Sequence, residues 1–249
     1  MKKDRIFWGT VAPLAAVVSS LLLVSVILIL RGANPIDIFQ VMISYGFDPR
    51  NLVSELNQTV SYYLAGVAAA IGFKMLLFNI GIDGQYRMGA FFGAVVGAAV
   101  SLPPVLHVLL IVITAMLAGG LWAAIAGYLK VRRGVSEVIS NIMLNFIAAA
   151  IIAFLLGEDL LGILPEGSQN VQTKPIPLSG QMPTFKMFNG EIYSFLFVAI
   201  FVGIAYWIML NKTVFGFNLR ATGLSFRAAR SSGVNAPGMI FITTVLSGA

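Results

Sequence analysis

Polar side chains gather in the segment Phe78–Ala90, FNIGIDGQYRMGA, inside a chain that is otherwise strongly apolar. Asn79 and Gln85 carry amides, which both donate and accept hydrogen bonds, and Asp83 carries a carboxylate between them. Glycines on either side of Asp83 let one helix end and a second helix begin at a new angle, with Asp83 as its N-cap. These groups could line a solute path at a broken or re-entrant element near Asn79–Gln85, because irregular backbone at membrane depth needs protein or water around it. An ordinary cytoplasmic turn is the alternative.

A second polar motif, SEVISNIMLNFIA, places Glu137, Asn141 and Asn145 at positions i, i+4 and i+8. At 100° per residue, the three side chains fall within about 80° of one helix face. An ionisable group at the centre of a bilayer costs at least about 2.5–3.5 kcal/mol, so it faces a bundle interior or an aqueous cavity. The stripe predicts either a binding surface for a solute with donors and acceptors, or contacts that hold two helices together.

The sequence carries none of the patterns typical of catalysis, such as HExxH or GxSxG, and it has no cysteine. The only histidine, His107, follows Pro103 and Pro104, and we expect it to be an exposed residue at an outer turn. The chain also lacks a GxxxxGKS/T loop, so any use of ATP would depend on another protein. We therefore expect a chain that is not an enzyme and that needs no cofactor and no metal.

The elements that must position these residues are membrane helices. Of the 249 residues, 58% are hydrophobic and only 10% are charged, whereas soluble domains carry about 25% charged residues. Mean hydropathy is +0.90, and apolar runs long enough to cross a bilayer recur along the chain. The predicted fold class is an all-α, polytopic transmembrane helical bundle that forms a single domain over residues 1–249.

We expect about six complete spans and a seventh that begins near Pro237 and is truncated where the chain ends. The first apolar run continues to Leu30, which is longer than the core of a signal peptide, so we interpret it as a retained span. The six predicted spans are Trp8–Leu30, Thr59–Leu77, Tyr86–Ser101, Val105–Leu129, Val138–Leu156 and Ile192–Leu210.

The distribution of charge predicts the orientation of these spans. Most of the 16 lysines and arginines fall in segments on the same side as the N-terminus, so the positive-inside rule places the N-terminus in the cytoplasm. This bias accounts for the net charge of +6, and we expect the lipid bilayer, and no nucleic acid, as a partner. The two long outer segments, Gly32–Gln58 and Gly157–Glu191, are expected to be mainly solvated loops.

Small residues recur at helical spacing in the third predicted span. Gly89, Gly93 and Gly97 lie four residues apart, with alanines flanking them in step. Such small-xxx-small patterns let two helix backbones approach closely, so that van der Waals contact holds them together within the lipid. We expect these glycines to pack helices and to have little direct part in function.

A basic segment at about 211–236 joins the sixth and seventh predicted spans and reads NKTVFGFNLRATGLSFRAARSSGVNAPG with its flanks. Ser225 is predicted to N-cap a short helix that runs through Arg230, with Gly233 at its end. Such a helix could bind anionic lipid through its arginines, or it could dock into a groove of a soluble partner.

Three segments, LFNIGIDGQYRMGA, GVSEVISNIMLNFIA and GFNLRATGLSFRAARSSGVN, resemble in sequence and order the signature segments of bacterial ABC-importer permeases. The resemblance covers about Leu52 to Ala249. It is to the branch that handles nucleosides, which is related to the simple-sugar and branched-chain amino-acid permeases. It implies a multi-pass protein of the bacterial plasma membrane, with a solute path lined by Asn79, Asp83, Gln85, Glu137, Asn141 and Asn145. Asp83 stands where the family usually has glutamate, which keeps the charge.

The resemblance also implies partners for the chain. These are a separate ABC ATPase, a second and similar permease that completes a heterodimer, and an extracytoplasmic substrate-binding lipoprotein. The basic segment would hold the coupling helix that docks on the ATPase, formed by Ser225, Arg227, Ala228, Ala229, Arg230 and Gly233. Arg227 stands where the family usually has an acidic residue, whereas the Ala-Ala pair and the spaced glycine match.

Two other functions fit parts of the pattern. A self-powered secondary transporter or channel for a small polar solute would use the same polar residues to bind a coupling ion. A membrane scaffold without transport would use the glycines for packing and the basic segment for lipid contact. The resemblance favours the permease and leaves its solute open among nucleosides, free bases and sugars.

Overall fold

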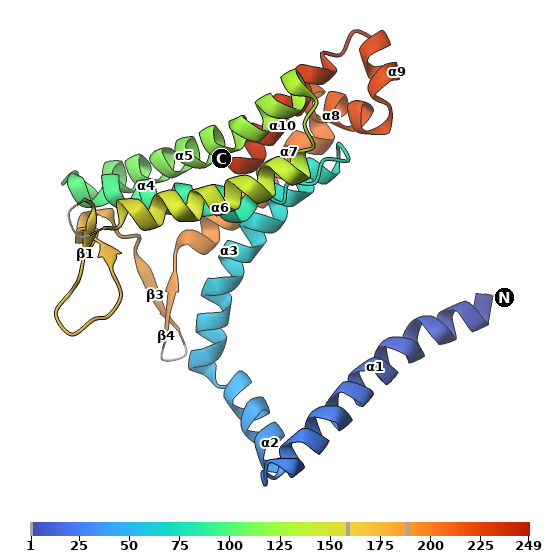
Figure 1. Cartoon of the computed structure of the whole chain (residues 1–249), viewed down its shortest axis with the longest axis vertical. Helices are drawn as coiled ribbons and strands as arrows, with labels where there is room; N and C mark the ends of the chain where they lie inside the picture. Colours follow the sequence, from blue (N-terminus) through green and yellow to red (C-terminus); the bar gives the residue numbers. More distant parts are fainter. Residues whose placement is uncertain (1, 158–159, 188–189) are drawn as a thin grey trace. The chain divides into compact units, whose positions relative to one another are not determined.

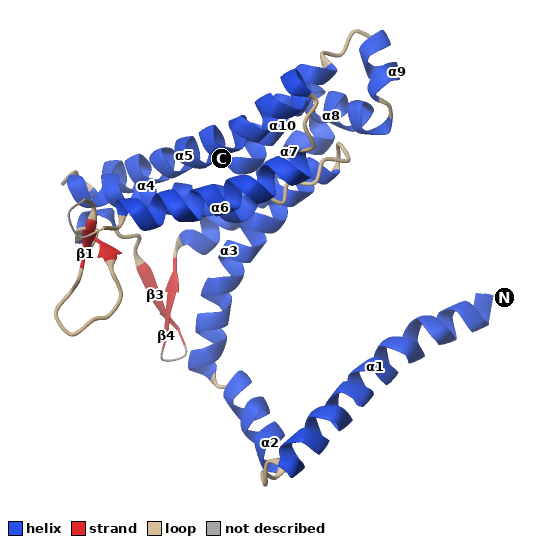
Figure 2. Cartoon of the chain, viewed as in Figure 1, coloured by secondary structure: helices blue, strands red, loops and turns tan. Residues whose placement is uncertain are grey.

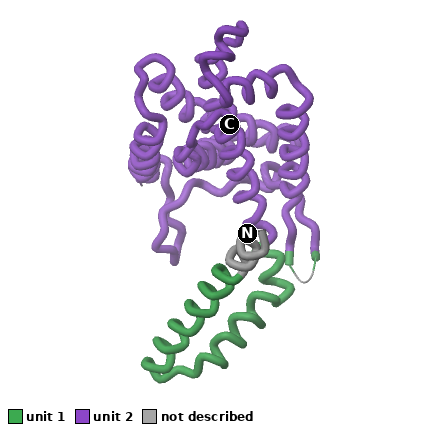
Figure 3. Tube along the Cα trace, turned by 90° about the vertical axis from the view of Figure 1, so that its right-hand side faces the viewer, with its two compact units in different colours: residues 1–55, 187–190 green, residues 56–186, 191–249 purple. Residues whose placement is uncertain are grey.

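The computed structural model describes residues 2–157, 160–187 and 190–249, and helices make up most of them (Figures 1 and 2). The chain divides into two compact units (Figure 3). The first comprises residues 1–55 with 187–190, and the second comprises residues 56–186 with 191–249. The prediction of a mainly helical chain is confirmed.

The first unit contains two helices and the beginning of a third. Helix α1 runs over Lys2–Leu30, α2 over Pro35–Gly46, and α3 over Pro49–Phe73. The prediction that Gly32–Gln58 is mainly a solvated loop is wrong, because an Asx residue followed by proline starts a helix at two places. The Asn34 side chain accepts a hydrogen bond from the Ile36 N–H at 3.1 Å, and Asp48 accepts one from the Arg50 N–H at 2.9 Å.

The second unit is built around α5 (Pro104–Arg133), which packs against α4 (Ile82–Ala99), α6 (Glu137–Leu155) and α10 (Ala236–Gly248) (Figure 1). Gly89, Gly93 and Gly97 all face α5. A Cβ added at Gly89 would lie 2.9 Å from the carbonyl oxygen of Ala115, so the two backbones are in direct contact there. On its other side α5 presents Gly127 to Phe241 and Thr244 of α10.

Short strands and one turn of 3₁₀ helix lie between α6 and α7. Strand β1 (Gly162–Ile163) pairs antiparallel with β2 (Gln172–Thr173), in the register Gly162 to Thr173. The 3₁₀ helix η1 (Leu178–Gly180) follows, and then the pair β3 (Thr184–Met187) and β4 (Gly190–Tyr193). The expectation of an all-α fold thus needs one correction, since two strand pairs occur where Gly157–Glu191 was predicted to be a loop.

The chain then continues through α7 (Phe195–Lys212), α8 (Val214–Leu224) and α9 (Phe226–Ser231) to α10. Buried apolar side chains from α3, α7, α8 and α10 meet in one cluster, formed with the segment after α3 by Ile71, Met75, Leu210, Leu219 and Met239. This core lies at the end of α7 that leads into α8. It anchors α8, a helix that was predicted only as part of a connecting segment.

Four helices among the described residues are long and apolar enough to cross a membrane. They are Val11–Leu30 within α1, together with α5, α6 and α7. Helices α3 and α4, which overlap the second and third predicted spans, fall outside this group. Their polar residues, including Asn57 in α3 and Asp83 and Gln85 in α4, reduce the mean hydropathy of each helix.

Candidate functional site

The irregular segment between α3 and α4 is the starting point of the site. Helix α3 ends at Phe73, α4 begins at Ile82, and Leu76 between them has a left-handed backbone with φ of 57°. The prediction that Asp83 caps the second helix is wrong, because Gly81 occupies the N-cap position. Asp83 instead lies in the first turn, is exposed, and pairs with Arg87 at 2.9 Å, so its carboxylate is not part of the polar cluster around Asn79.

Asn79, which is half-buried, is the centre of a group of amides and one hydroxyl. Its Nδ2 donates to Gln85 Oε1 at 2.9 Å and to Ser247 Oγ at 2.8 Å. Its Oδ1 accepts from Gln85 Nε2 at 3.0 Å and from the backbone N–H of Gly81 at 3.1 Å. The Ser247 hydroxyl donates to the carbonyl of Ala68 at 2.6 Å, so α3, α4 and α10 meet at this point.

Asn141 and Asn145 connect α6 to the same group. Asn141 is 1% exposed, and its Nδ2 donates to Asn79 Oδ1 at 3.4 Å. Asn145 accepts from the N–H of Gly84 at 2.9 Å and donates to the carbonyl of Ile80 at 3.0 Å. Within the part of the chain that the structure describes, Asn141 Oδ1 has no hydrogen-bond partner. A buried acceptor without a partner costs free energy, which makes this oxygen a candidate contact for a ligand or water.

Glu137 lies at the first position of α6, where its Oε2 accepts a hydrogen bond from Lys130 Nζ at 2.5 Å. The ion pair borders a small cavity that is also lined by Asn79, Asn141 and Ser247. The stripe on α6 therefore divides into an ion pair at its end and two amides that contact the α3–α4 segment and the start of α4.

The prediction that His107 is exposed is wrong. The side chain is 0% exposed at the start of α5, where η1 covers it. Its Nδ1 lies 2.9 Å from Ser179 Oγ, and its Nε2 lies 2.9 Å from the carbonyl oxygen of Gly97. A Cβ at Gly180 would lie 3.0 Å from the imidazole ring, so this glycine permits the close approach. His107 thus fastens η1 to the end of α4.

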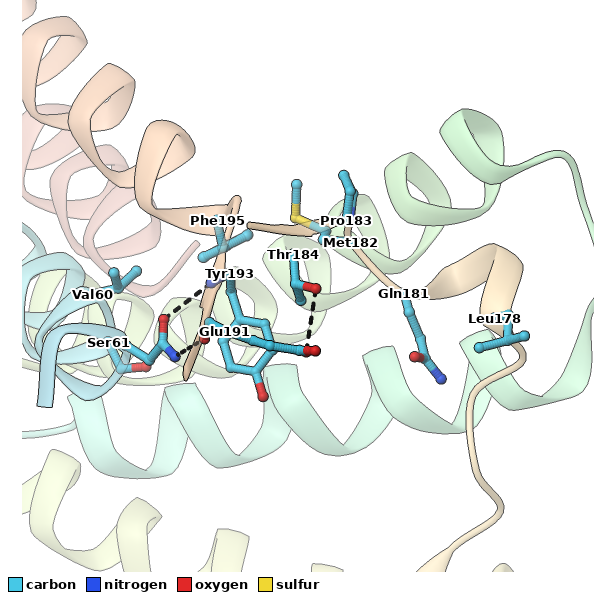
Figure 4. Close-up of a pocket in the computed structure, with 11 residues that line it drawn as sticks. Val60, Ser61, Leu178, Gln181, Met182, Pro183, Thr184, Glu191, Tyr193 and Phe195 are labelled. Carbon is cyan, nitrogen blue, oxygen red and sulfur yellow. Dashed lines mark hydrogen bonds between the residues drawn. The ribbon is translucent and has the colours of Figure 1, made fainter. Parts of the chain in front are cut away.

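An open cavity of about 680 Å³ lies beside η1, between the N-terminal half of α3 and the β3–β4 pair (Figure 4). Asn57 of α3 fixes one wall, because its Nδ2 donates to the Glu191 carbonyl at 2.8 Å and its Oδ1 accepts from the Tyr193 N–H at 3.1 Å. Sequence patterns gave no signal for this cavity. Its residues come from segments separated by more than one hundred positions.

The segment after α7 forms the helices α8 and α9, which follow the end of α7 that lies away from the cavity. Ser225 caps α9 as predicted, accepting from the Ala228 N–H at 3.3 Å, and Gly233 beyond the helix has φ of +86°. Ala229 is buried, whereas Arg227, Ala228 and Arg230 are exposed. Helix α8 packs so closely on the segment after α3 that a Cβ at Gly223 would lie 3.0 Å from the Cα of Met75.

The site thus brings together Asn79, Gln85, Asn141 and Asn145 in one amide cluster, and it leaves Asp83 and the residues of α9 outside that cluster. Ser247 and Lys130 are further members that sequence reasoning missed. Ser247 is one of three hydroxyl residues in an otherwise apolar helix, and Lys130 lies in a basic run that suggested only orientation. Among the described residues, no three carboxylate or imidazole side chains come together in a way that could hold a metal ion.

Helices that are long and apolar enough to cross a membrane, among them α6 with its two amides, define a helical membrane protein. Residues 51–249 match the family described as the branched-chain amino acid transport system / permease component, and the chain belongs to this family. No solved structure matches the chain significantly.

Several curated relatives match nearly the whole chain, and three of them are ABC transporter permeases by name. The guanosine ABC transporter permease protein NupP of Bacillus subtilis is 31% identical, over 95% of this chain and 68% of its own length. The glucose ABC transporter permease protein TsgB13 of Haloferax volcanii is 30% identical, over 97% and 65%. The nucleoside ABC transporter permease protein NupB of Lactococcus lactis subsp. cremoris is 29% identical, over 95% and 67%. The chain therefore spans about two thirds of the length of these relatives.

Proposed function

We propose that this chain is the membrane-spanning permease subunit of an ATP-driven ABC importer for nucleosides. The observation that carries the proposal is the family match over residues 51–249. The matched range includes the whole amide cluster, which consists of Asn79, Gln85, Asn141 and Asn145. Two of the three relatives are named for guanosine or nucleosides, which favours that solute class over a sugar. Nucleosides present both donors and acceptors, as amide side chains do.

In this proposal the amide cluster lies on the solute path. Asn79, Gln85 and Asn141 offer donors and acceptors without a net charge, so they suit a neutral polar solute. The unpartnered Asn141 Oδ1 would be a contact for a donor of the solute. Asp83 and Glu137 would take part only at the cytoplasmic end of the path, since each is already paired with a basic side chain.

The proposed topology has six complete crossings, formed by α1, α3, α4, α5, α6 and α7, with α10 belonging to a further one. The N-terminus would lie in the cytoplasm of a bacterial cell. Lys130, Arg132 and Arg133 end α5, and Lys212 ends α7, at the ends that adjoin α6 and α8. The positive-inside rule places those ends in the cytoplasm.

The chain would work with three partners and would not hydrolyse ATP itself. Helix α9, with Ser225, Arg227, Ala228, Ala229, Arg230 and Gly233, would dock on a separate ATPase subunit. A second, similar permease would complete a heterodimer around the path, and an extracytoplasmic lipoprotein would deliver the solute.

The first test is purification of the tagged protein, expressed with its genomic neighbours, followed by assays for ATPase activity and for uptake of tritiated guanosine into proteoliposomes. We expect an ATPase to co-purify, and we expect Ala228→Glu and Gly233→Asp to remove it. Gln169→Glu, which adds a carboxylate in the segment before α7, should have no effect. A preparation without ATPase, whose uptake survives ATP depletion but collapses with an ionophore, would instead establish a self-powered transporter.

A further inference from the structure

The open cavity beside η1 has the properties of a binding site in its own right. Its volume of about 680 Å³ lies within the range of small-molecule sites in proteins. Its lining combines the Tyr193 and Phe195 rings with the polar side chains of Ser61, Gln181 and Glu191. This combination of apolar surface with a few polar groups is typical of sites that bind small molecules with rings.

Two long-range clamps hold the walls of this cavity in place. Asn57 binds the backbone of β4 at Glu191 and Tyr193, across 134 and 136 positions of sequence. The buried His107 binds Ser179 in η1, next to the wall residues Leu178 and Gln181. A merely solvated loop needs neither clamp, so the cavity is a defined element of the fold.

Gln181 and Glu191 supply acceptor oxygens to the cavity, and the hydroxyls of Ser61 and Tyr193 can both donate and accept. Glu191 Oε2 accepts from Thr184 Oγ1 at 3.2 Å, and its other carboxylate oxygen has no partner within the described residues. Gln181 uses Nε2 to bind the Ile176 carbonyl at 3.0 Å, which leaves its Oε1 free to accept. In Figure 4 the Gln181 amide and the Tyr193 ring extend to the same side as the Glu191 carboxylate.

The charge of the lining also determines which ligands the cavity can bind. Among the described residues that line the cavity, Glu191 is the one charged group, and none is basic. A phosphate or carboxylate on the ligand would meet a like charge without a counter-ion, which disfavours binding. The cavity therefore suits a neutral, ring-bearing solute rich in hydroxyl or amino donors.

The cavity and the amide cluster lie on the same face of α3. Ser61 lines the cavity, and the Ala68 carbonyl accepts the hydrogen bond of Ser247 in the cluster. Seven residues separate them, which is about two turns and about 10 Å along a helix. Helix α7 runs from the cavity towards α8 and is long enough to cross a membrane, so the cavity lies on the side opposite α8 and α9.

We propose that this cavity is an outer binding site that receives the neutral solute before it reaches the amide cluster and excludes phosphorylated forms of it. The inference rests on the proposed function as an importer and adds the site at which selection against phosphate occurs. Tyr193 would stack on the ring of the solute, while Gln181 and Glu191 would accept hydrogen bonds from its hydroxyl or amino groups.

The test is equilibrium binding of tritiated guanosine to the purified permease–ATPase complex in lipid nanodiscs, with the binding lipoprotein left out. Guanosine 5′-monophosphate serves as the charged competitor. We expect Tyr193→Ala to raise the dissociation constant of guanosine about tenfold, since base–aromatic stacking is lost. Gln181→Ala should raise it about threefold. Gln169→Ala, in the same outer segment but outside the lining, should leave it unchanged.

For the wild-type complex, the dissociation constant of the monophosphate should be at least tenfold higher than that of guanosine. Glu191→Gln should reduce this ratio of the two dissociation constants. Unchanged guanosine binding in both Tyr193→Ala and Gln181→Ala would overturn the inference. So would variants that bind guanosine normally but no longer dock the lipoprotein, because the cavity would then be a protein-docking surface. ATP-driven guanosine uptake by the same wild-type complex is measured in parallel, so failure of this site is distinguishable from failure of the proposed function.

Discussion

Asn141→Ala is the change that best separates a solute path from helix packing. Asn79 takes part in five hydrogen bonds, whereas Asn141 takes part in one, at 3.4 Å, and keeps an oxygen without a described partner. Polar contacts between membrane helices contribute about 0.6 kcal/mol each on average. If the amides only hold helices together, Asn79→Ala should therefore cost about 3 kcal/mol of stability and Asn141→Ala only about 0.6 kcal/mol.

A role on the path predicts a different relation between the two variants. A loss of about 0.6 kcal/mol in the free energy of unfolding changes the folding equilibrium constant by less than threefold. Such a change is too small to affect membrane abundance strongly. We expect Asn141→Ala to reduce ATP-driven guanosine uptake at least tenfold at normal abundance. The neighbouring Ser140→Ala is the matched control, because its hydroxyl is also buried and also has no hydrogen-bond partner in the described part of the chain.

The assay combines uptake into proteoliposomes, abundance by quantitative immunoblot and thermal unfolding in detergent. Uptake that falls only in proportion to abundance in Asn141→Ala would refute the path. An equal loss of uptake in Ser140→Ala would refute it as well, since any buried polar truncation near the cluster would then suffice.

Three further changes test how the elements are held. Gly89→Leu should force α4 away from the α5 backbone and lower abundance several-fold by immunoblot, whereas Leu at the exposed neighbour Ala90 should be tolerated. Gly223→Val should lift α8 from the segment after α3 and lower the solute moved per ATP hydrolysed about tenfold, and an unchanged ratio would count against that contact as a coupling element. His107→Phe should destabilise the protein by about 2–3 kcal/mol in thermal unfolding, because the Gly97 carbonyl and the Ser179 hydroxyl lose their partner; a stable variant would contradict the clamp.

Local signals in the sequence predicted the helix termini that depend on neighbouring residues. Ser225 and Gly233 mark the two ends of α9 as expected. A hydroxyl cap and a left-handed glycine determine helix ends through residues only a few positions away. The α6 stripe was also predictable, since helical periodicity alone puts Asn141 and Asn145 on one face. The two Asx–Pro pairs that start α2 and α3 carried the same kind of signal but lay in a segment interpreted as loop.

Contacts between distant segments could not be predicted in this way. The Asn79 amide meets Asn141 across 62 positions and Ser247 across 168, and no spacing rule links such residues. His107 follows two prolines that mark a turn, yet η1 arrives more than seventy positions later and buries it. Burial of a turn residue depends on what packs over it, so its local sequence gave the wrong answer.

The short segment after α3 connects α8, which leads into the proposed docking helix α9, to the amide cluster. The backbone of Met75 in this segment packs against Gly223 of α8. The Met75 sulfur accepts a hydrogen bond from the buried Thr243 hydroxyl of α10 at 3.1 Å. Asn79 follows Met75 by four residues. Because both ends of so short a segment are held by packed side chains, a shift of α8 would have to displace Asn79 or break one of these contacts. The amount of solute moved per ATP hydrolysed by Gly223→Val is the measurement that decides whether this segment transmits a shift of α8 to Asn79.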